Sequence, residues 1–389
     1  MYVHFPYCLQ RCSYCDFAVA VRKNIPHAEY TVALRNELRA KAPLFSDRRL
    51  VSVYFGGGTP SLWDPVCLGE TLHDIVRSFA APPVSTLEVT LECDPGTVTE
   101  HELAAWRSTG VNRLSIGAQS FQTDRLTDLR RQHQPDDIFE LVKSARKIGF
   151  ANLSLDLLIG GEETCAELSD DLAQLVSLDP MHVSLYQLSI EPHTLLSVLI
   201  RKGLKNKPSE EWQKEAYQRS IAHLASAGFE QYEISNFAKG KEHRSIHNRL
   251  HWTHGEYLGL GASAHSFRQL PLGKGERFGN VKGPSAYLRA WQAEYPGTYL
   301  PSIDNPTLNL YETRDREPLW RESLWLGLRE IEGVHLPTFR ELHRVDPLVV
   351  CADAIEQMSK RGLLLNTTEH LRLTADGILF ADEVGAAFL

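Results

Sequence analysis

The chain has 389 residues, of which 43% are hydrophobic and 23% are charged, and its formal net charge is −8 at pH 7. It contains no run of 18 apolar residues, so we expect no membrane-spanning segment. The acidic balance, without a long basic run, argues against a broad nucleic-acid-binding surface. The length suits one large domain and a smaller one. A strand and a cysteine loop are expected at the very N-terminus and leave no room for a targeting peptide, so we expect a cytoplasmic protein.

Three cysteines lie close together near the N-terminus. Cys8, Cys12 and Cys15 form a C-x3-C-x2-C pattern directly after the apolar run 2–5. Three thiolates on one tight loop can hold three corners of an iron-sulfur cluster, and the fourth iron then has the open position typical of a catalytic metal site. The alternative is a structural zinc bound by these thiolates and His4, although zinc-binding thiolates usually come as C-x2-C or C-x4-C pairs. Disulfides are disfavoured, because seven cysteines, an odd number, occur without a signal sequence.

Apolar runs and helical patterns alternate along residues 1–228. Asp64 and Pro65 suit an N-cap and first turn, Thr99 and Glu102 suit a capping box, and Gly149 suits a helix end. Strands are expected at 2–5, 51–55, 87–91, 111–116, 153–159 and 183–188, and helices at 27–42, 65–79, 99–106, 138–148, 167–178 and 209–227. Because strands that alternate with helices are joined by right-handed crossovers, the pattern predicts a parallel α/β sheet.

The alternation ends near residue 237. Residues 237–267 are rich in His, Asn, Trp and Gly, and residues 271–306 are expected to be loop with one helical stretch near 285–294. From residue 317 the pattern is helical, and 362–384 is expected to form a small β-hairpin. The sequence therefore predicts three segments: a domain over 1–236, a linker over 237–305 and a small C-terminal domain over 306–389.

Polar and glycine residues follow several of the expected strands. Residues 56–60 form a glycine-rich turn after the second strand, Glu92 and Gln119 end the next two, and Arg131 and Asp156 lie further along. In parallel α/β folds, ligands bind beyond the carboxyl ends of the strands. Glycines allow close approach of the backbone to a ligand, and an arginine can bind a carboxylate bidentately. Taken singly, each residue also has a structural reading, such as an ordinary turn or compensation of a helix dipole.

These motifs together resemble the radical S-adenosylmethionine (SAM) superfamily. The resemblance rests on the cysteine pattern with Tyr14 before the last cysteine, and on the Gly57-Gly58-Thr59-Pro60 turn after the next strand. It implies a 4Fe-4S cluster on the three cysteines, whose open iron binds the amino and carboxylate groups of SAM. One electron then splits SAM into methionine and a 5'-deoxyadenosyl radical. The fold implied is an incomplete (β/α)6 radical SAM barrel with a smaller C-terminal helical, winged-helix-like domain.

By resemblance, eight residues match positions at which the family binds SAM. They are Tyr2, Gly57, Gly58, Thr59, Glu92, Gln119, Arg131 and Asp156. Two departures stand out: Arg130 precedes Arg131 where the family usually has glycine, and residues 160–163, Gly-Gly-Glu-Glu, replace a common Gly-Leu-Pro-Gly turn. The second departure puts the conformation of that loop in doubt.

Downstream motifs resemble the branch that contains oxygen-independent coproporphyrinogen III dehydrogenase and the haem chaperones of the HemW type. Phe17 stands where the dehydrogenase has a further cysteine, as in HemW-type proteins. His247-Asn248-Arg249-Leu250-His251-Trp252 is similar to their His-Asn-x-x-Tyr-Trp haem motif, with His251 in place of tyrosine. The resemblance implies haem binding through His247 and His251. Taken alone, two histidines four residues apart would simply form local hydrogen bonds.

Two functions are therefore expected, from different classes. The first is a haem chaperone that binds haem and passes it to haemoproteins, with the cluster and SAM in a regulatory or assembly role and without coproporphyrinogen dehydrogenase activity. The second is a radical SAM enzyme that decarboxylates coproporphyrinogen III or opens haem anaerobically. Phe17 and the His247 motif favour the first. The chaperone reading also admits a homodimer and peripheral membrane contact during haem delivery, and a zinc-binding barrel without redox chemistry is a third, remote reading.

Overall fold

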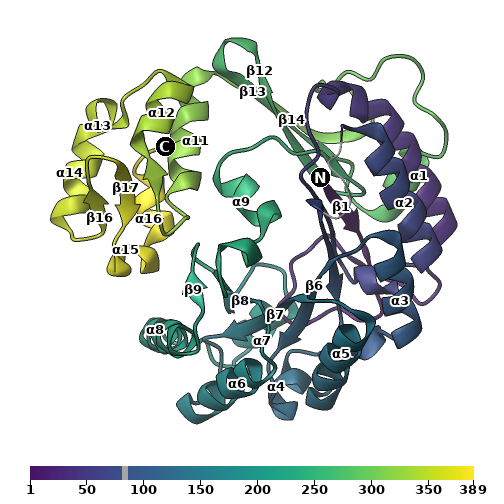
Figure 1. The fold of residues 1–389 in the computed structure, drawn as a ribbon, viewed down its shortest axis with the longest axis horizontal. Helices are drawn as coiled ribbons and strands as arrows, with labels where there is room; N and C mark the ends of the chain where they lie inside the picture. The colour runs from purple at the N-terminus through teal and green to yellow at the C-terminus, as the bar shows by residue number, and fades with distance from the viewer. Residues whose placement is uncertain (81–85) are drawn as a thin grey trace.

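The computed structural model describes residues 1–80 and 86–389, and its centre is a nine-stranded sheet (Figure 1). Six neighbouring strands run parallel in chain order. They are β1 (Tyr2–Phe5), β4 (Ser52–Gly57), β5 (Glu88–Cys93), β6 (Arg113–Gln119), β7 (Asn152–Ile159) and β8 (His182–Gln187). The six strands expected from the sequence are thus confirmed. Two short antiparallel strands, β10 (Asn236–Ala238) and β9 (Glu230–Gln231), extend the sheet beyond β8, and β11 (Gly259–Leu260) extends it beyond β1. The edge strands β11 and β9 do not pair within the described ranges, so the barrel is incomplete.

Helices cover the convex side of this sheet (Figure 1). They are α1 (His27–Lys41), α2 (Pro65–Ser78), α3 (Glu100–Thr109), α5 (Pro135–Ile148), α6 (Cys165–Ser177) and α8 (Glu210–Ser226). Two shorter helices, α4 (Thr123–Asp128) and α7 (Leu195–Arg201), lie beside the loop that carries the three N-terminal cysteines, where Ser13 bonds the carbonyl of Asp128 and the N–H of Leu196. The cap residues act as expected: the Asp64 side chain accepts from the backbone of Val66, and Thr99 and Glu102 form a capping box. Gly149 ends α5 with a φ of +99°, which favours glycine.

The parallel strands place different residues on their two faces. Because successive side chains of a strand point to opposite faces, Phe55, Leu91 and Leu155 pack into the hydrophobic core, where each is fully buried. Their neighbours in sequence, Glu92 and Asp156, lie on the other face of the sheet. The polar residues are therefore on the concave side, inside the incomplete barrel.

Residues 237–314 contain more regular structure than the sequence predicts. Strands β12 (His265–Leu270), β13 (Lys274–Asn280) and β14 (Leu308–Arg314) form an antiparallel sheet. The prediction of a loop over 271–306 is therefore wrong at β13. This strand has two glycines and three charged residues, which are unfavourable in a strand pattern, and it is stabilised by pairing with β12 and β14. The expected helical stretch is α10 (Pro284–Ala290). Strand β14 follows residue 305, the expected domain boundary, yet pairs with β13.

The C-terminal part forms a compact unit with its own core (Figure 1). It consists of α11 (Arg316–Gly327), β15 (Val334–His335), α12 (Leu336–His343), α13 (Pro347–Val350), α14 (Ala352–Lys360), β16 (Leu364–Asn366), β17 (His370–Leu373), α15 (Ala375–Leu379) and α16 (Ala381–Ala386). The expected hairpin is correct for β16 and β17 and wrong beyond residue 374, where Thr374 caps a helix.

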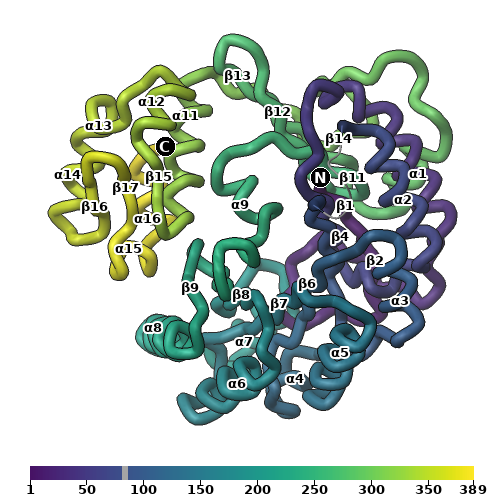
Figure 2. The backbone as a smooth tube through the Cα atoms, viewed as in Figure 1, coloured from purple at the N-terminus to yellow at the C-terminus, as the bar shows by residue number. Residues whose placement is uncertain are grey.

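One further helix, α9 (Ile246–Trp252), lies between the C-terminal unit and the sheet (Figure 2). It contacts both α11 and β4. Within the described part of the chain, no helix combines the length and the apolar character needed to cross a bilayer.

Candidate functional site

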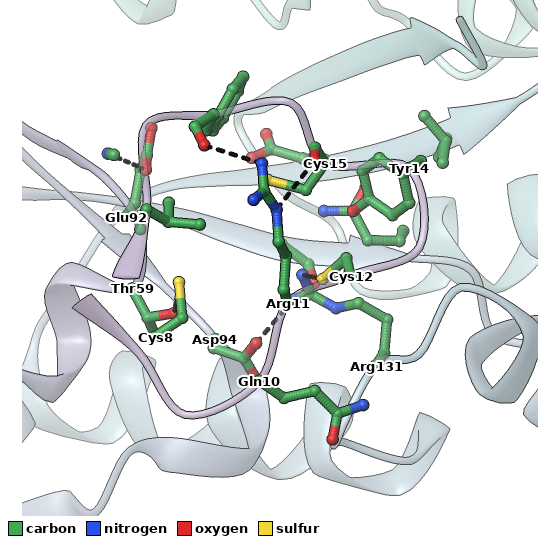
Figure 3. A pocket seen from close by; sticks show the side chains of 18 of the residues that line it. Cys8, Gln10, Arg11, Cys12, Tyr14, Cys15, Thr59, Glu92, Asp94 and Arg131 are labelled. Carbon is green, nitrogen blue, oxygen red and sulfur yellow. Dashed lines mark hydrogen bonds and ion pairs between the residues drawn. The ribbon is translucent and has the colours of Figure 1, made fainter. Parts of the chain in front are cut away.

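The three N-terminal cysteines lie on one short loop at the mouth of the barrel. Cys8 ends β2 (Tyr7–Cys8), which pairs with β3 (Ala20–Val21), so the two ends of the loop are held together. Cys8, Cys12 and Cys15 are free thiols that line one cavity of about 360 Å³, which we call the cysteine cavity (Figure 3). Burial raises the pKa of Cys8 to about 11 and also raises that of Cys15. Burial therefore disfavours the thiolate forms of Cys8 and Cys15 in the ligand-free protein.

The glycine turn after β4 packs directly against the cysteine loop. The backbone N–H of Gly58 donates to the Phe5 carbonyl at 2.8 Å, and the Thr59 hydroxyl donates to Cys8 Sγ at 3.4 Å. A Cβ atom on Gly58 would lie 2.7 Å from the Tyr7 carbonyl oxygen and 3.0 Å from Cys8 Sγ. Only glycine fits here, because any side chain would push the cysteine loop away.

Two carboxyl groups face the cysteine cavity from the sheet. Glu92 on β5 accepts hydrogen bonds from the Tyr54 hydroxyl at 2.9 Å and from the Gly57 N–H at 3.1 Å. Asp156 on β7 accepts from Ser115 Oγ at 3.2 Å. Burial raises the pKa of Glu92 to about 7, with a further contribution from Asp156, and burial also raises the pKa of Asp156. The floor of the cavity therefore holds acids that are easily protonated.

Arg131 joins the cysteine loop to the floor of the cavity. Its Nη1 donates to Cys12 Sγ at 3.5 Å, and its Nη2 donates to Asp94 Oδ2 at 2.9 Å and to the Gly117 carbonyl at 3.0 Å. Burial alone would raise the pKa of Asp94, but the Arg131 guanidinium holds it below its usual value. Arg131 Nε has no partner among the described residues, so one donor is still open. Gln119, at the end of β6 with a φ of +65°, lines the same cavity.

The structure brings seven of the eight expected SAM residues into the cavity wall, and Tyr2 is the exception. The ring of Tyr2 lies 6.2 Å from that of Tyr54, and its hydroxyl bonds His4 Nδ1 at 3.0 Å. The wall also contains residues that were not predicted from the sequence, among them Tyr54, Asp94 and Tyr186. Alternate residues of a strand point to the same face, so this alternation along β4 and β8 could have placed Tyr54 and Tyr186 on the concave face.

The two histidines of the expected haem motif lie one turn apart on α9. The Glu88 carboxylate accepts from the backbone N–H groups of Ile246 and His247, both at 2.9 Å, and so anchors the start of the helix. His247 is only 4% exposed, stacks on Tyr54 with centroids 4.8 Å apart, and bonds Ser52 Oγ through Nδ1 at 3.2 Å. Burial holds its pKa well below the usual value. His247 is therefore part of the packed interior.

His251 instead lines a second cavity, of about 580 Å³, which we call the α9 cavity. The cavity lies among α9, α11, β10 and β13, and its wall includes Trp252, Tyr257, Arg277 and Arg329. Tyr186 lines both this cavity and the cysteine cavity, so the two meet at its side chain. The structure thus separates the two expected haem residues: His251 faces a cavity, and His247 does not.

Comparisons with known proteins identify the family of the chain. The sequence profile of the radical SAM superfamily matches residues 2–175, and that of the HemN C-terminal domain matches residues 315–380. The chain is 33% identical to the heme chaperone HemW of Bacillus subtilis (strain 168), with 100% of this chain and 98% of the relative covered. It is 32% identical to HemW of Escherichia coli (strain K12), with 96% and 97% covered.

Two more proteins are similar to the chain over most of their length. The mitochondrial radical S-adenosyl methionine domain-containing protein 1 of Bos taurus is 34% identical, with 99% of this chain and 86% of the relative covered. The solved coproporphyrinogen III oxidase HemN of Escherichia coli superposes with a TM-score of 0.82 at 22% identity, with 100% and 89% covered, which shows a shared fold. The chain belongs to the radical SAM superfamily and, within it, to the heme chaperone HemW family.

Proposed function

We propose that the chain is a haem chaperone, which binds haem and transfers it to haemoproteins while carrying a 4Fe-4S cluster and SAM. The observation that carries the proposal is the pairing of two cavities that meet at Tyr186: one is lined by the three cysteines and the other by His251. The comparisons support both parts, because this chain matches the radical SAM profile and its relatives carry the name heme chaperone. A cytoplasmic location, a homodimer and peripheral membrane contact belong to the proposal as predictions from the sequence.

The cysteine loop suits a cluster in its donor chemistry. Cys8, Cys12 and Cys15 supply three thiolates, and Thr59 and Arg131 donate hydrogen bonds to two of the sulfurs. Such donors tune the reduction potential of iron-sulfur clusters. Among the described residues, no three His, Cys, Asp or Glu side chains converge closely enough to hold a single metal ion. We propose a cluster because the three cysteines follow the C-x3-C-x2-C pattern of the radical SAM superfamily.

The rest of the cysteine cavity suits SAM. Gly57 and Gly58 bring backbone close to the ligand, and the open Nε of Arg131 offers a donor to a carboxylate. Glu92, Gln119 and Asp156 offer partners to hydroxyl and amino groups. Bound to a reduced cluster, SAM supplies radical chemistry. The protein's part is to hold SAM and, through the packed glycine turn, to fix the position of the cysteine loop.

A porphyrin-modifying radical SAM enzyme is the second candidate, and one observation favours it. Because Tyr186 lines both cavities, a ligand in the α9 cavity would lie next to the place proposed for SAM. A chaperone does not require this proximity, whereas hydrogen abstraction by a deoxyadenosyl radical does.

An anaerobic titration separates the two functions. After reconstitution of the cluster, haem is added while the visible spectrum is recorded, and coproporphyrinogen III conversion is assayed in the same preparation. Stoichiometric haem binding without decarboxylation supports the chaperone. Decarboxylation with consumption of SAM, and without a stable haem complex, would replace it by the enzyme.

A further inference from the structure

The wall of the α9 cavity concentrates buried polar atoms that have no hydrogen-bond partner among the described residues. These atoms are Asn236 Oδ1, Trp252 Nε1, both ring nitrogens of His254, Glu322 Oε2 and Arg329 Nε. Buried polar groups in native proteins are nearly always satisfied, so each exception needs an explanation. Six such atoms around one cavity indicate that the cavity is a binding site and that its occupant carries some polar groups.

His254 is the most unusual member of this set. It is only 4% exposed, and its ring stacks on Phe267 with centroids 4.5 Å apart and planes 9° apart. Its Nε2 lies 3.9 Å from Glu322 Oε2, which is too far for a hydrogen bond. The packing therefore holds an imidazole in one orientation while both of its nitrogens lack a partner.

The backbone of His254 is also unusual. Its φ is +53°, in the left-handed region that residues other than glycine rarely adopt. The conformation is held where α9 ends, by hydrogen bonds from His254 N–H to the His251 carbonyl at 3.1 Å and from Gly255 N–H to the Leu250 carbonyl at 2.8 Å. A left-handed residue just after the last turn is a common way for a helix to end, so this conformation fixes the position of the imidazole and does not by itself indicate a ligand.

The basic groups of the cavity differ in how far they are neutralised. Arg277 is tied to Glu322 at 2.6 Å and to Glu312 at 3.1 Å. Arg329 pairs with the exposed Asp382 through Nη1 at 2.9 Å, but its Nε has no partner and its guanidinium lies over the Trp252 ring. Arg329 is therefore the group with a donor available to a ligand carboxylate.

We propose that the α9 cavity receives the tetrapyrrole and that His254 supplies the imidazole that meets its iron, with Arg329 directed to a carboxylate side chain. This inference rests on the proposed haem function and names the residues that carry it out. A volume of about 580 Å³ lies within the range of roughly 300–1,000 Å³ found for small-molecule sites. Aromatic rings of Trp252 and Tyr257 supply apolar wall for a flat macrocycle. His247, packed between Ser52 and Tyr54, is assigned no contact with the ligand.

The test is chemical rescue of the cluster-reconstituted full chain. His254→Gly keeps the left-handed backbone at no steric cost and removes only the imidazole. We expect haem affinity to fall roughly 10–100-fold, the Soret band to shift, and added free imidazole to restore both. His193→Gly is the matched control, because His193 also has a positive φ, of +66°, but is exposed and outside both cavities. Circular dichroism and melting check that both variants fold.

The possible outcomes distinguish a failure of this inference from a failure of the proposed haem chaperone function. If the wild-type chain binds haem and His254→Gly binds it like His193→Gly, the assignment of His254 is overturned, and the chaperone function stands. If the wild-type chain binds no haem, the function fails as well.

A second measurement addresses the carboxylate. Haem and its dimethyl ester are compared on the wild-type chain and on Arg329→Gln. The wild-type chain is expected to prefer the free acid, and the variant to lose about tenfold of that preference. Equal preference in both proteins would remove Arg329 from the site.

Discussion

The ring of Tyr54 stacks on the ring of His247, with centroids 4.8 Å apart. The same tyrosine donates a hydrogen bond from its hydroxyl to Glu92 at 2.9 Å, on the floor of the cysteine cavity. On the other side, His247 contacts the ring of His251, which lines the α9 cavity, with centroids 5.0 Å apart. A continuous row of rings therefore connects the walls of the two cavities. The burial of His247 within this row suggests that it supports the structure, which the first prediction tests.

His247→Ala is expected to lower the free energy of unfolding by roughly 2–4 kcal/mol, because it leaves a void beside Tyr54 and removes the partner of Ser52. Chemical denaturation of the ligand-free protein measures this. The matched control is His101→Ala, an exposed site on α3, which should change the stability by less than about 0.5 kcal/mol. Equal stability of the two variants would contradict the packed position of His247.

Gly58→Ala is expected to reduce cluster loading strongly, because its Cβ would lie 2.7 Å from the Tyr7 carbonyl oxygen and 3.0 Å from Cys8 Sγ. Iron and sulfide content after reconstitution measures the loading. Gly149→Ala is the control: its φ of +99° should cost about 1 kcal/mol of stability, but its Cβ meets open space far along the chain from the cysteine loop. Full cluster content in Gly58→Ala would show that the turn does not shape the loop.

Arg131→Lys is expected to weaken SAM binding by about tenfold while the cluster still assembles on the three cysteines. Lysine keeps the charge but loses the fork that holds Asp94, Gly117 and the Cys12 sulfur together and leaves Nε open. Equilibrium binding of SAM to the reconstituted protein measures the effect. Arg219→Lys, on the exposed face of α8, should leave SAM affinity unchanged. A variant with normal affinity would exclude Arg131 from the SAM site.

The pKa of Glu92, raised to about 7 mainly by burial, predicts how stability depends on pH. The folded state binds the Glu92 proton more tightly than the unfolded state does, so this group favours folding least above pH 7. Between about pH 4.5 and 7 the free energy of unfolding of the ligand-free protein should fall by about 3 kcal/mol on account of Glu92. Glu92→Gln should remove this contribution to the pH dependence of the free energy of unfolding. Relative to the wild-type chain, the variant should therefore gain stability as the pH rises.

Glu233, whose pKa burial also raises to about 7, titrates over the same range and should keep its own contribution in that variant. Unfolding measured in denaturant at several pH values tests the prediction. An unchanged slope in Glu92→Gln would mean that Glu92 is ionised freely in the folded protein.

Much of the architecture could be predicted from local patterns. Apolar runs located all six parallel strands, and Asp64, Thr99 and Gly149 marked helix ends, because capping and strand burial depend on neighbouring residues. The strand β13 was not predicted, because its glycines and charged residues do not form a strand pattern and pairing with β12 and β14 stabilises it. The helices after residue 374 escaped for a similar reason, since short helices depend on tertiary packing.

The sequence by itself determined the cysteine loop, the glycine turn, the strand ends that carry Glu92 and Gln119, and the strand that contains Asp156. These residues meet because parallel strands bring their carboxyl ends to one side of the sheet. Only the tertiary structure decided which side chains face a cavity. Tyr2 lies outside the wall of the cysteine cavity, whereas Asp94 and Tyr186 are part of it. His247 is buried, and His251 and His254 line the α9 cavity. Spacing along a helix gives the face of a residue, but the surface that covers that face comes from elements distant in the chain, here β4 on one side of α9 and α11 on the other.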